Sequence, residues 1–151
     1  RERGYLLANL NPLEAPATTH PLLDWTFFGL TPADLETPFA AGNLLNIGTA
    51  KLKDIIALLK DTYCGSIGAE FTHIQDQQSR EWVAMTMEKT RNQAQLDAGT
   101  KKFIYKRLAE AEGFERFLHT RYVAQKRFSV EGGEGVIPML DCMIEVGADL
   151  G

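Results

Sequence analysis

The chain has 151 residues, 44% of them hydrophobic and 24% charged, and its formal net charge is −4 at pH 7. These values are typical of a globular protein with a core and exclude a disordered chain. The negative charge argues against nucleic acid as a partner. No apolar run approaches the roughly 20 residues that span a bilayer, so we expect no membrane partner either.

The first third of the chain is rich in proline. Residues 1–48 contain five of the six prolines, and proline interrupts helices and favours turns. We therefore expect short elements and an ordered loop here. Within this stretch, Thr31 and Pro32 predict one short helix, because threonine is a good N-cap and proline suits the first helical position.

Two helices are predicted in the middle of the chain. Apolar residues at spacings of three and four indicate a helix over residues 50–63, capped by Thr49 and ended by Gly65. Residues 77–91 form the second predicted helix, with Asp76 as its cap. Its buried side chains are expected to be Trp82 together with Met85 or Met87.

Two further helices are predicted towards the C-terminus. One starts near Thr100, and the other covers residues 134–148 with Pro138 in its first turn, where the missing N–H costs little. The apolar stripe of the first comprises Phe103, Ile104, Leu108, Ala111, Phe114 or Glu115, Leu118 and Tyr122. The expected buried side of the second comprises Val136, Ile137, Leu140, Met143 and Ile144. No alternation of strands and helices is evident, so we predict a mainly α chain.

The segment between these two helices has the clearest chemical character. Gly132, Gly133 and Gly135 lead into a helix N-terminus, which attracts anions through its free N–H groups. A basic stretch also changes to an acidic one at the junction of Arg127 and Phe128. Two interpretations remain open: a tight loop before a helix with solvated faces of opposite charge, and a turn that faces an anion.

The remaining residue types give little support for other chemistry. The three histidines lie at no metal-ligand spacing from one another, from cysteine or from a carboxylate, so we predict no metal site. Cys64 and Cys142 lack a secretory context and are expected as free thiols. The chain begins with Arg1 rather than Met and ends at Gly151 without a closing element, so we expect an internal fragment, with a processed terminus as the alternative.

Several blocks, taken together and in order, resemble one enzyme family. Residues 3–13 read RGYLLANLNPL, residues 28–31 FGLT, and residues 61–74 DTYCGSIGAEFTHI. They are followed by AEGFE at 111–115, FLHTRY at 117–122 and KRFSVEGGE at 126–134. This ordered set resembles the decarboxylase (first) component of the 2-oxoglutarate dehydrogenase complex, and it covers nearly the whole chain.

The resemblance implies a fold, an activity and partners. Residues 1–125 would be the helical N-terminal region of a transketolase-like α/β enzyme, and residues 126–151 the truncated beginning of its thiamine-binding α/β domain. The family uses thiamine diphosphate and Mg²⁺ to decarboxylate 2-oxoglutarate, in the tricarboxylic acid cycle. It passes the succinyl unit to a lipoyl group on the succinyltransferase component of the multienzyme complex. The family is homodimeric, and we expect the bacterial cytoplasm, or the mitochondrial matrix for a eukaryotic source.

Two positions are carried over as substrate-binding residues. By resemblance Phe128 lines the substrate pocket, with an ordinary core aromatic as the alternative, and Arg127 would have an orienting or electrostatic role. No catalytic, cofactor-binding or metal residue is carried over, because the family's Gly-Asp-Gly…Asn-Asn element and His-Arg-Gly-Arg segment are absent from the sequence. The chain alone is therefore expected to be inactive. A relative acting on 2-oxoadipate and a non-catalytic helical interaction module are the alternatives.

Overall fold

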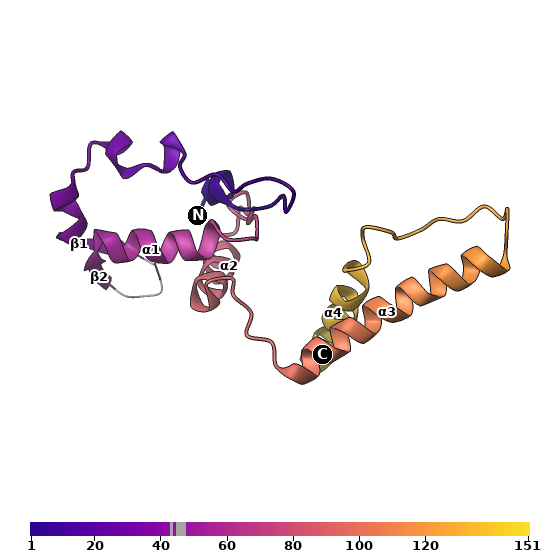
Figure 1. Cartoon of the computed structure of the whole chain (residues 1–151). Coiled ribbons are helices and arrows are strands. Elements are labelled where there is room, and N and C mark those ends of the chain that lie inside the picture. Colours follow the sequence, from indigo (N-terminus) through magenta and orange to yellow (C-terminus); the bar gives the residue numbers. More distant parts are fainter. Residues whose placement is uncertain (43, 45–47) are drawn as a thin grey trace. The chain divides into compact units, whose positions relative to one another are not determined.

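The computed structural model describes residues 1–42, 44 and 48–151 (Figure 1). The chain divides into two compact units, which we call the N-terminal unit (Arg1–Ala94) and the C-terminal unit (Gln95–Gly151). Helices predominate in the described residues, and one two-stranded sheet accompanies them. The prediction of a mainly α chain is thus confirmed. The predicted domain boundary near residue 125 concerns a longer protein and stays a prediction.

Short 3-10 helices begin the N-terminal unit, as the prolines predicted for the part of residues 1–48 that the structure describes. They span Gly4–Leu7, Pro21–Leu23, Trp25–Phe28 and Pro32–Glu36. The predicted start at Thr31 is confirmed. The carboxylate of Asp34 accepts hydrogen bonds from the backbone N–H and the hydroxyl of Thr31, both at 2.7 Å. This reciprocal arrangement fixes the first turn of the short helix.

A β-hairpin, which the sequence did not predict, precedes the first long helix. Strand β1 (Pro38–Gly42) pairs antiparallel with β2 (Gly48–Lys51), with an irregularity in register between Ala40 and Gly42. Thr49 therefore lies in a strand and is not a helix cap. Helix α1 (Leu52–Tyr63) begins two residues later than expected, with Lys51 as N-cap. It ends at Tyr63 as predicted, although its C-cap is Cys64 rather than Gly65. Residues 48–51 form a strand rather than the first turn of the helix, because their backbone N–H and C=O groups pair with those of β1.

Helix α2 (Gln77–Thr90) confirms the predicted element and its cap, since the carboxylate of Asp76 accepts from the N–H of Ser79 at 2.7 Å. Its buried face was predicted wrongly for Trp82, whereas of the two alternatives Met85 and Met87 the second is confirmed. Trp82 is 65% exposed and Met85 is exposed, whereas Ala84 is buried and Met87 packs against the core. Ala84 and Glu88 are four residues apart and share one face of the helix, which turns Trp82 to the opposite side.

The core of the N-terminal unit is small and includes a buried charge. Tyr63 and Phe71 stack with ring centroids 6.0 Å apart beside Ala84. Glu88 is fully buried and accepts from the hydroxyl of Tyr63 at 2.9 Å. It also accepts from two nitrogens of Arg1, at 2.5 and 2.9 Å. Burial, reinforced by the carboxylate, raises the pKa of Tyr63 well above its usual value.

Two further contacts attach the start of the chain to the end of α1. The N–H of Asn9 donates to the carbonyl of Gly65 at 2.8 Å. Gly4 lies so close to Tyr63 that a β-carbon on it would be 2.6 Å from the Tyr63 carbonyl oxygen. The sequence blocks 3–13 and 61–74, which both carried the family resemblance, are therefore neighbours in space.

Two helices make up most of the C-terminal unit. Helix α3 (Ala98–Arg121) starts at Asp97, whose carboxylate accepts from the N–H of Thr100 at 2.7 Å, and α4 (Val136–Leu150) lies alongside it (Figure 1). Arg107 of α3 and Asp141 of α4 form an ion pair at 2.6 Å, although not with hydrogen-bond geometry. The predicted stripe of α3 is confirmed for its partly buried members, which are Phe103, Ile104, Leu108, Ala111, Glu115 and Leu118.

The predicted buried side of α4 is largely wrong for this unit. Of the five expected members, Ile137 is half-buried and the other four are exposed: Val136, Leu140, Met143 and Ile144. The buried residue of this helix is Pro138. Within the C-terminal unit, α3 covers the side of α4 that carries Pro138 and Asp141. One helix can cover only one stripe of another, so the apolar residues around the rest of α4 stay exposed.

Candidate functional site

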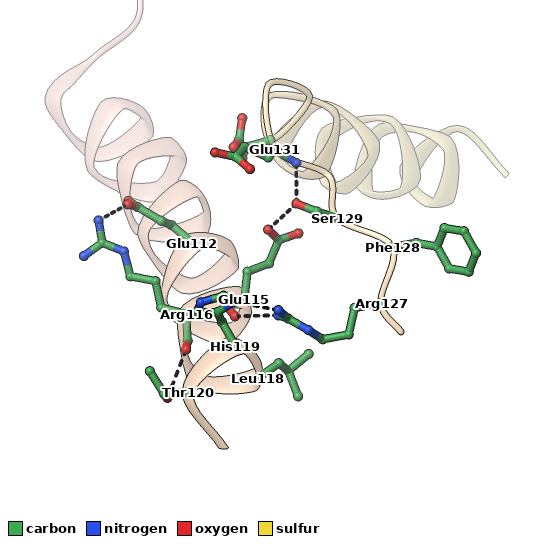
Figure 2. Close-up of a pocket in the computed structure, with 11 residues that line it drawn as sticks. Glu112, Glu115, Arg116, Leu118, His119, Thr120, Arg127, Phe128, Ser129 and Glu131 are labelled. Atoms are coloured by element: carbon green, nitrogen blue, oxygen red, sulfur yellow. Dashed lines mark hydrogen bonds and ion pairs between the residues drawn. The ribbon is translucent and has the colours of Figure 1, made fainter. Parts of the chain in front are cut away.

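The candidate site lies between α3 and the segment that leads from α3 into α4 (Figure 2). This segment, residues 125–135, contains both positions that the sequence analysis selected. An open cavity of about 530 Å³ separates it from the helix. The cavity is lined by Glu112, Glu115, Arg116, Leu118, His119 and Thr120 of α3, and by Arg127, Phe128, Ser129, Glu131 and Glu134.

A single carboxylate attaches the segment to the helix. One oxygen of Glu115 accepts from the hydroxyl of Ser129 at 2.6 Å, and the other accepts from the N–H of Val130 at 2.8 Å. The Ser129 hydroxyl in turn accepts from the N–H of Glu131 at 2.9 Å. The hydrogen bonds from Ser129 and then Val130 stabilise the ionised form and lower the pKa of Glu115. We call this arrangement the Glu115 clamp.

Arg127 makes a second attachment to α3. Its Nη2 lies 2.7 Å from Nδ1 of His119, and its Nη1 donates a long hydrogen bond of 3.5 Å to the carbonyl of Glu115. A guanidinium group only donates, so Nδ1 of His119 must accept. The predicted residue Arg127 thus contacts α3 through its charged end.

Phe128 points the other way. Its ring is directed away from the α3 residues (Figure 2), and 90% of its surface is exposed. Nζ of Lys126 lies 5.5 Å from the ring centroid, within the range of a cation–π contact. Phe128 is therefore not a core residue of the C-terminal unit. Its role towards a substrate, like that of Arg127, stays a prediction.

The charges around the cavity do not form an anion site. Glu112, Glu115, Glu131 and Glu134 line it against two arginines. At the start of α4, the N–H groups of Val136 and Ile137 already donate to carbonyls of the preceding loop, at 3.0 and 3.1 Å. The structure therefore favours the tight-loop interpretation of residues 132–135 over an anion-facing turn.

Glu115 was not identified from the sequence as a residue of the candidate site. It had left position 114 or 115 open in the apolar stripe of α3, and the structure places Glu115 there, half-buried, while Phe114 is exposed. A carboxylate on an otherwise apolar stripe was a signal for a polar partner, because a half-buried charge needs hydrogen-bond donors. The donors, Ser129 and Val130, are 14 and 15 residues away in sequence.

Metal ligands, reactive thiols and membrane-spanning helices are other features that could mark a functional site. Among residues 1–42, 44 and 48–151, no three or more His, Cys, Asp or Glu side chains are placed to hold a metal ion. Cys64 and Cys142 are free, as expected, and burial raises the pKa of the Cys64 thiol. None of the helices in the part of the chain that the structure describes has the length and apolar character needed to cross a bilayer.

Comparison with known proteins gives a consistent result. The chain is 41% identical over 153 residues to the 2-oxoglutarate dehydrogenase E1 component of Azotobacter vinelandii, and the match covers all of this chain. It is 41% identical over 154 residues to the multifunctional 2-oxoglutarate metabolism enzyme of Mycolicibacterium vanbaalenii, and 42% identical over 149 residues to the E1 component of Cupriavidus necator. The chain spans only 16%, 12% and 16% of these proteins, respectively. No protein-family model matches it.

Proposed function

We propose that the chain is part of a 2-oxoglutarate dehydrogenase E1 component, because it matches a segment of such proteins over its whole length. The complete protein would decarboxylate 2-oxoglutarate with thiamine diphosphate and Mg²⁺. It would then transfer the succinyl unit to the lipoyl group of a succinyltransferase partner, as a homodimer in the bacterial cytoplasm. The observation that supports this proposal is the match of 41% identity across all of the chain.

The residues of this chain do not by themselves fit the cofactor. The described residues offer no cluster of metal ligands, and the cavity beside Phe128 is lined by more carboxylates than cations. Such a lining would repel both a diphosphate and the two carboxylates of 2-oxoglutarate. Thiamine diphosphate and Mg²⁺ would therefore be held by parts of the complete protein outside this chain.

This chain would contribute the helical region ahead of the first α/β domain and one wall of the substrate pocket. Residues 1–125 would form the helical region ahead of the first α/β domain of a transketolase-like fold, and α4 would begin that domain. Phe128 would then line the substrate pocket from the segment before α4, with Arg127 behind it. The exposed ring of Phe128 supports this role, because a 90% exposed aromatic side chain is available to contact a substrate.

The test is turnover by the complete protein that contains residues 1–151. Purified with thiamine diphosphate and Mg²⁺, it should release CO₂ from 2-oxoglutarate with a higher kcat/KM than from 2-oxoadipate. The 151-residue chain serves as the comparison and should release none above the buffer blank. A preference for 2-oxoadipate would assign the protein to that relative instead. No cofactor-dependent release from either acid would contradict the proposal and favour a non-catalytic helical module.

A further inference from the structure

We propose that Glu115 is a positioning residue for substrate binding: its carboxylate fixes the backbone of residues 127–130 and so directs the ring of Phe128. This inference rests on the proposed function for the substrate role of Phe128. The clamp itself rests on contacts within the C-terminal unit.

Packing against the part of the chain that the structure describes does not fix the ring of Phe128, because this residue is 90% exposed. The ring does contact Nζ of Lys126, but the long side chain of Lys126 is itself exposed. The direction of the ring therefore depends on the backbone that carries it.

Both neighbours of Phe128 in the sequence are attached to α3. Arg127 reaches His119 at 2.7 Å, and Ser129 reaches Glu115 at 2.6 Å. In an extended segment, successive side chains point to opposite sides. Holding the side chains before and after Phe128 against the helix therefore turns Phe128 outwards, as Figure 2 shows.

Glu115 is the main attachment of this segment to α3. Its carboxylate accepts both from a side chain and from a backbone N–H, and such charge-assisted bonds are about twice as strong as neutral ones. The hydroxyl of Ser129 extends the clamp to the N–H of Glu131. The hydrogen bond from Arg127 to the backbone carbonyl of Glu115 is long, at 3.5 Å. A substitution at position 115 leaves this backbone carbonyl in place, so it removes the carboxylate bonds alone.

The experiment compares three variants of the complete protein, loaded with thiamine diphosphate and Mg²⁺. Glu115→Ala should raise KM for 2-oxoglutarate by about tenfold or more, since small misplacements at an active site are costly. The affinity for thiamine diphosphate should stay unchanged. Glu115→Gln should keep KM much closer to the wild-type value than Glu115→Ala does. Its side-chain carbonyl can accept from the N–H of Val130, while its side-chain NH2 group donates to the hydroxyl of Ser129. Glu110→Ala is the matched control: Glu110 is a carboxylate of the same helix outside the cavity lining and pairs with Lys106 within α3, so KM should stay within about twofold of wild type.

Amide hydrogen exchange at Val130 reports the clamp without any turnover. Exchange should accelerate in Glu115→Ala and stay at the wild-type rate in Glu110→Ala. Unchanged exchange in Glu115→Ala would overturn the clamp. Faster exchange with an unchanged KM, or a KM that rises equally in the Glu110→Ala control, would overturn the positioning role. A wild-type protein that does not turn over 2-oxoglutarate would instead refute the proposed function, and the substrate role of the clamp with it.

Discussion

Glu88→Ala should destabilise the N-terminal unit, because Glu88 accepts hydrogen bonds from both Arg1 and Tyr63. The carboxylate is fully buried and receives bonds from Arg1 at 2.5 and 2.9 Å and from Tyr63 at 2.9 Å. Removing one partner of a buried charged pair typically costs about 3–5 kcal/mol. The Arg1 side chain keeps 27% exposure and can be partly hydrated, which places the expected loss towards the lower end.

Tyr63→Phe tests the same network from the other side. It removes one hydrogen bond to a charged group and leaves both Arg1 bonds in place, so the expected loss is about 1.5–3 kcal/mol. The double variant should lose less than the sum of the two single losses, because both act on the same contact. Lys89→Ala, on the exposed side of the same helix, is the control and should stay within about 0.5 kcal/mol of wild type.

The assay is urea unfolding followed by tryptophan fluorescence. Trp25 and Trp82 are the two tryptophans, and both lie in the N-terminal unit, so the signal reports that unit alone. With an m-value of about 1–3 kcal/mol per M, a loss of about 3 kcal/mol lowers the midpoint by about 1 M or more. If Glu88→Ala unfolds at the same midpoint as Lys89→Ala, the network around Glu88 does not stabilise the unit and the reasoning fails.

Four further predictions follow from individual contacts. Gly4→Ala should cost about 1–3 kcal/mol in the same fluorescence assay, because its β-carbon would collide with Tyr63; an unchanged midpoint would mean that this segment is not docked. The isolated chain should self-associate through the exposed apolar residues of α4, and a monodisperse monomer in light scattering would contradict this. Phe128→Ala in the complete protein should leave the Tm nearly unchanged while kcat/KM falls on the order of 10²-fold, whereas a core residue would cost about 3–5 kcal/mol and lower the Tm. Glu36 should titrate at about 2, since hydrogen bonds from two lysines lower its pKa; its stabilising contribution is present above pH about 4.5 and lost as pH falls towards 2, and an NMR midpoint near 4.5 would show that these ion pairs do not form in solution.

Local signals in the sequence predicted the helices well. Asp76 caps α2 as expected, and the stripe from Phe103 to Leu118 marks the partly buried side of α3. These features depend on residues three or four apart, which periodicity and capping rules describe directly. The hairpin before α1 was missed because its strands are short and one begins with Pro38, which weakens any strand pattern.

Features that depend on distant partners could not be predicted in this way. Nothing near Glu88 in sequence shows that Arg1 will neutralise it, so a buried glutamate on α2 was not expected and Trp82 was chosen for the core instead. At the candidate site, Arg127 and Phe128 were selected by resemblance. Their opposite directions follow from the contact between Ser129 and Glu115, which only the folded chain creates.

The contact between Arg1 and Glu88 also bears on the order in which the N-terminal unit is assembled. These two residues are 87 positions apart, so the ion pair closes almost the entire unit into one loop. During synthesis α1 can form early from local contacts, but Glu88 must leave the ribosome before Arg1 can reach its partner. Contacts of such long range are slow to form because the closure entropy has to be overcome first. The contacts of Gly4 and Asn9 with residues 63–65 need only α1, whereas the ion pair of Arg1 has to wait until α2 is complete, so we expect it to form late in the folding of this unit.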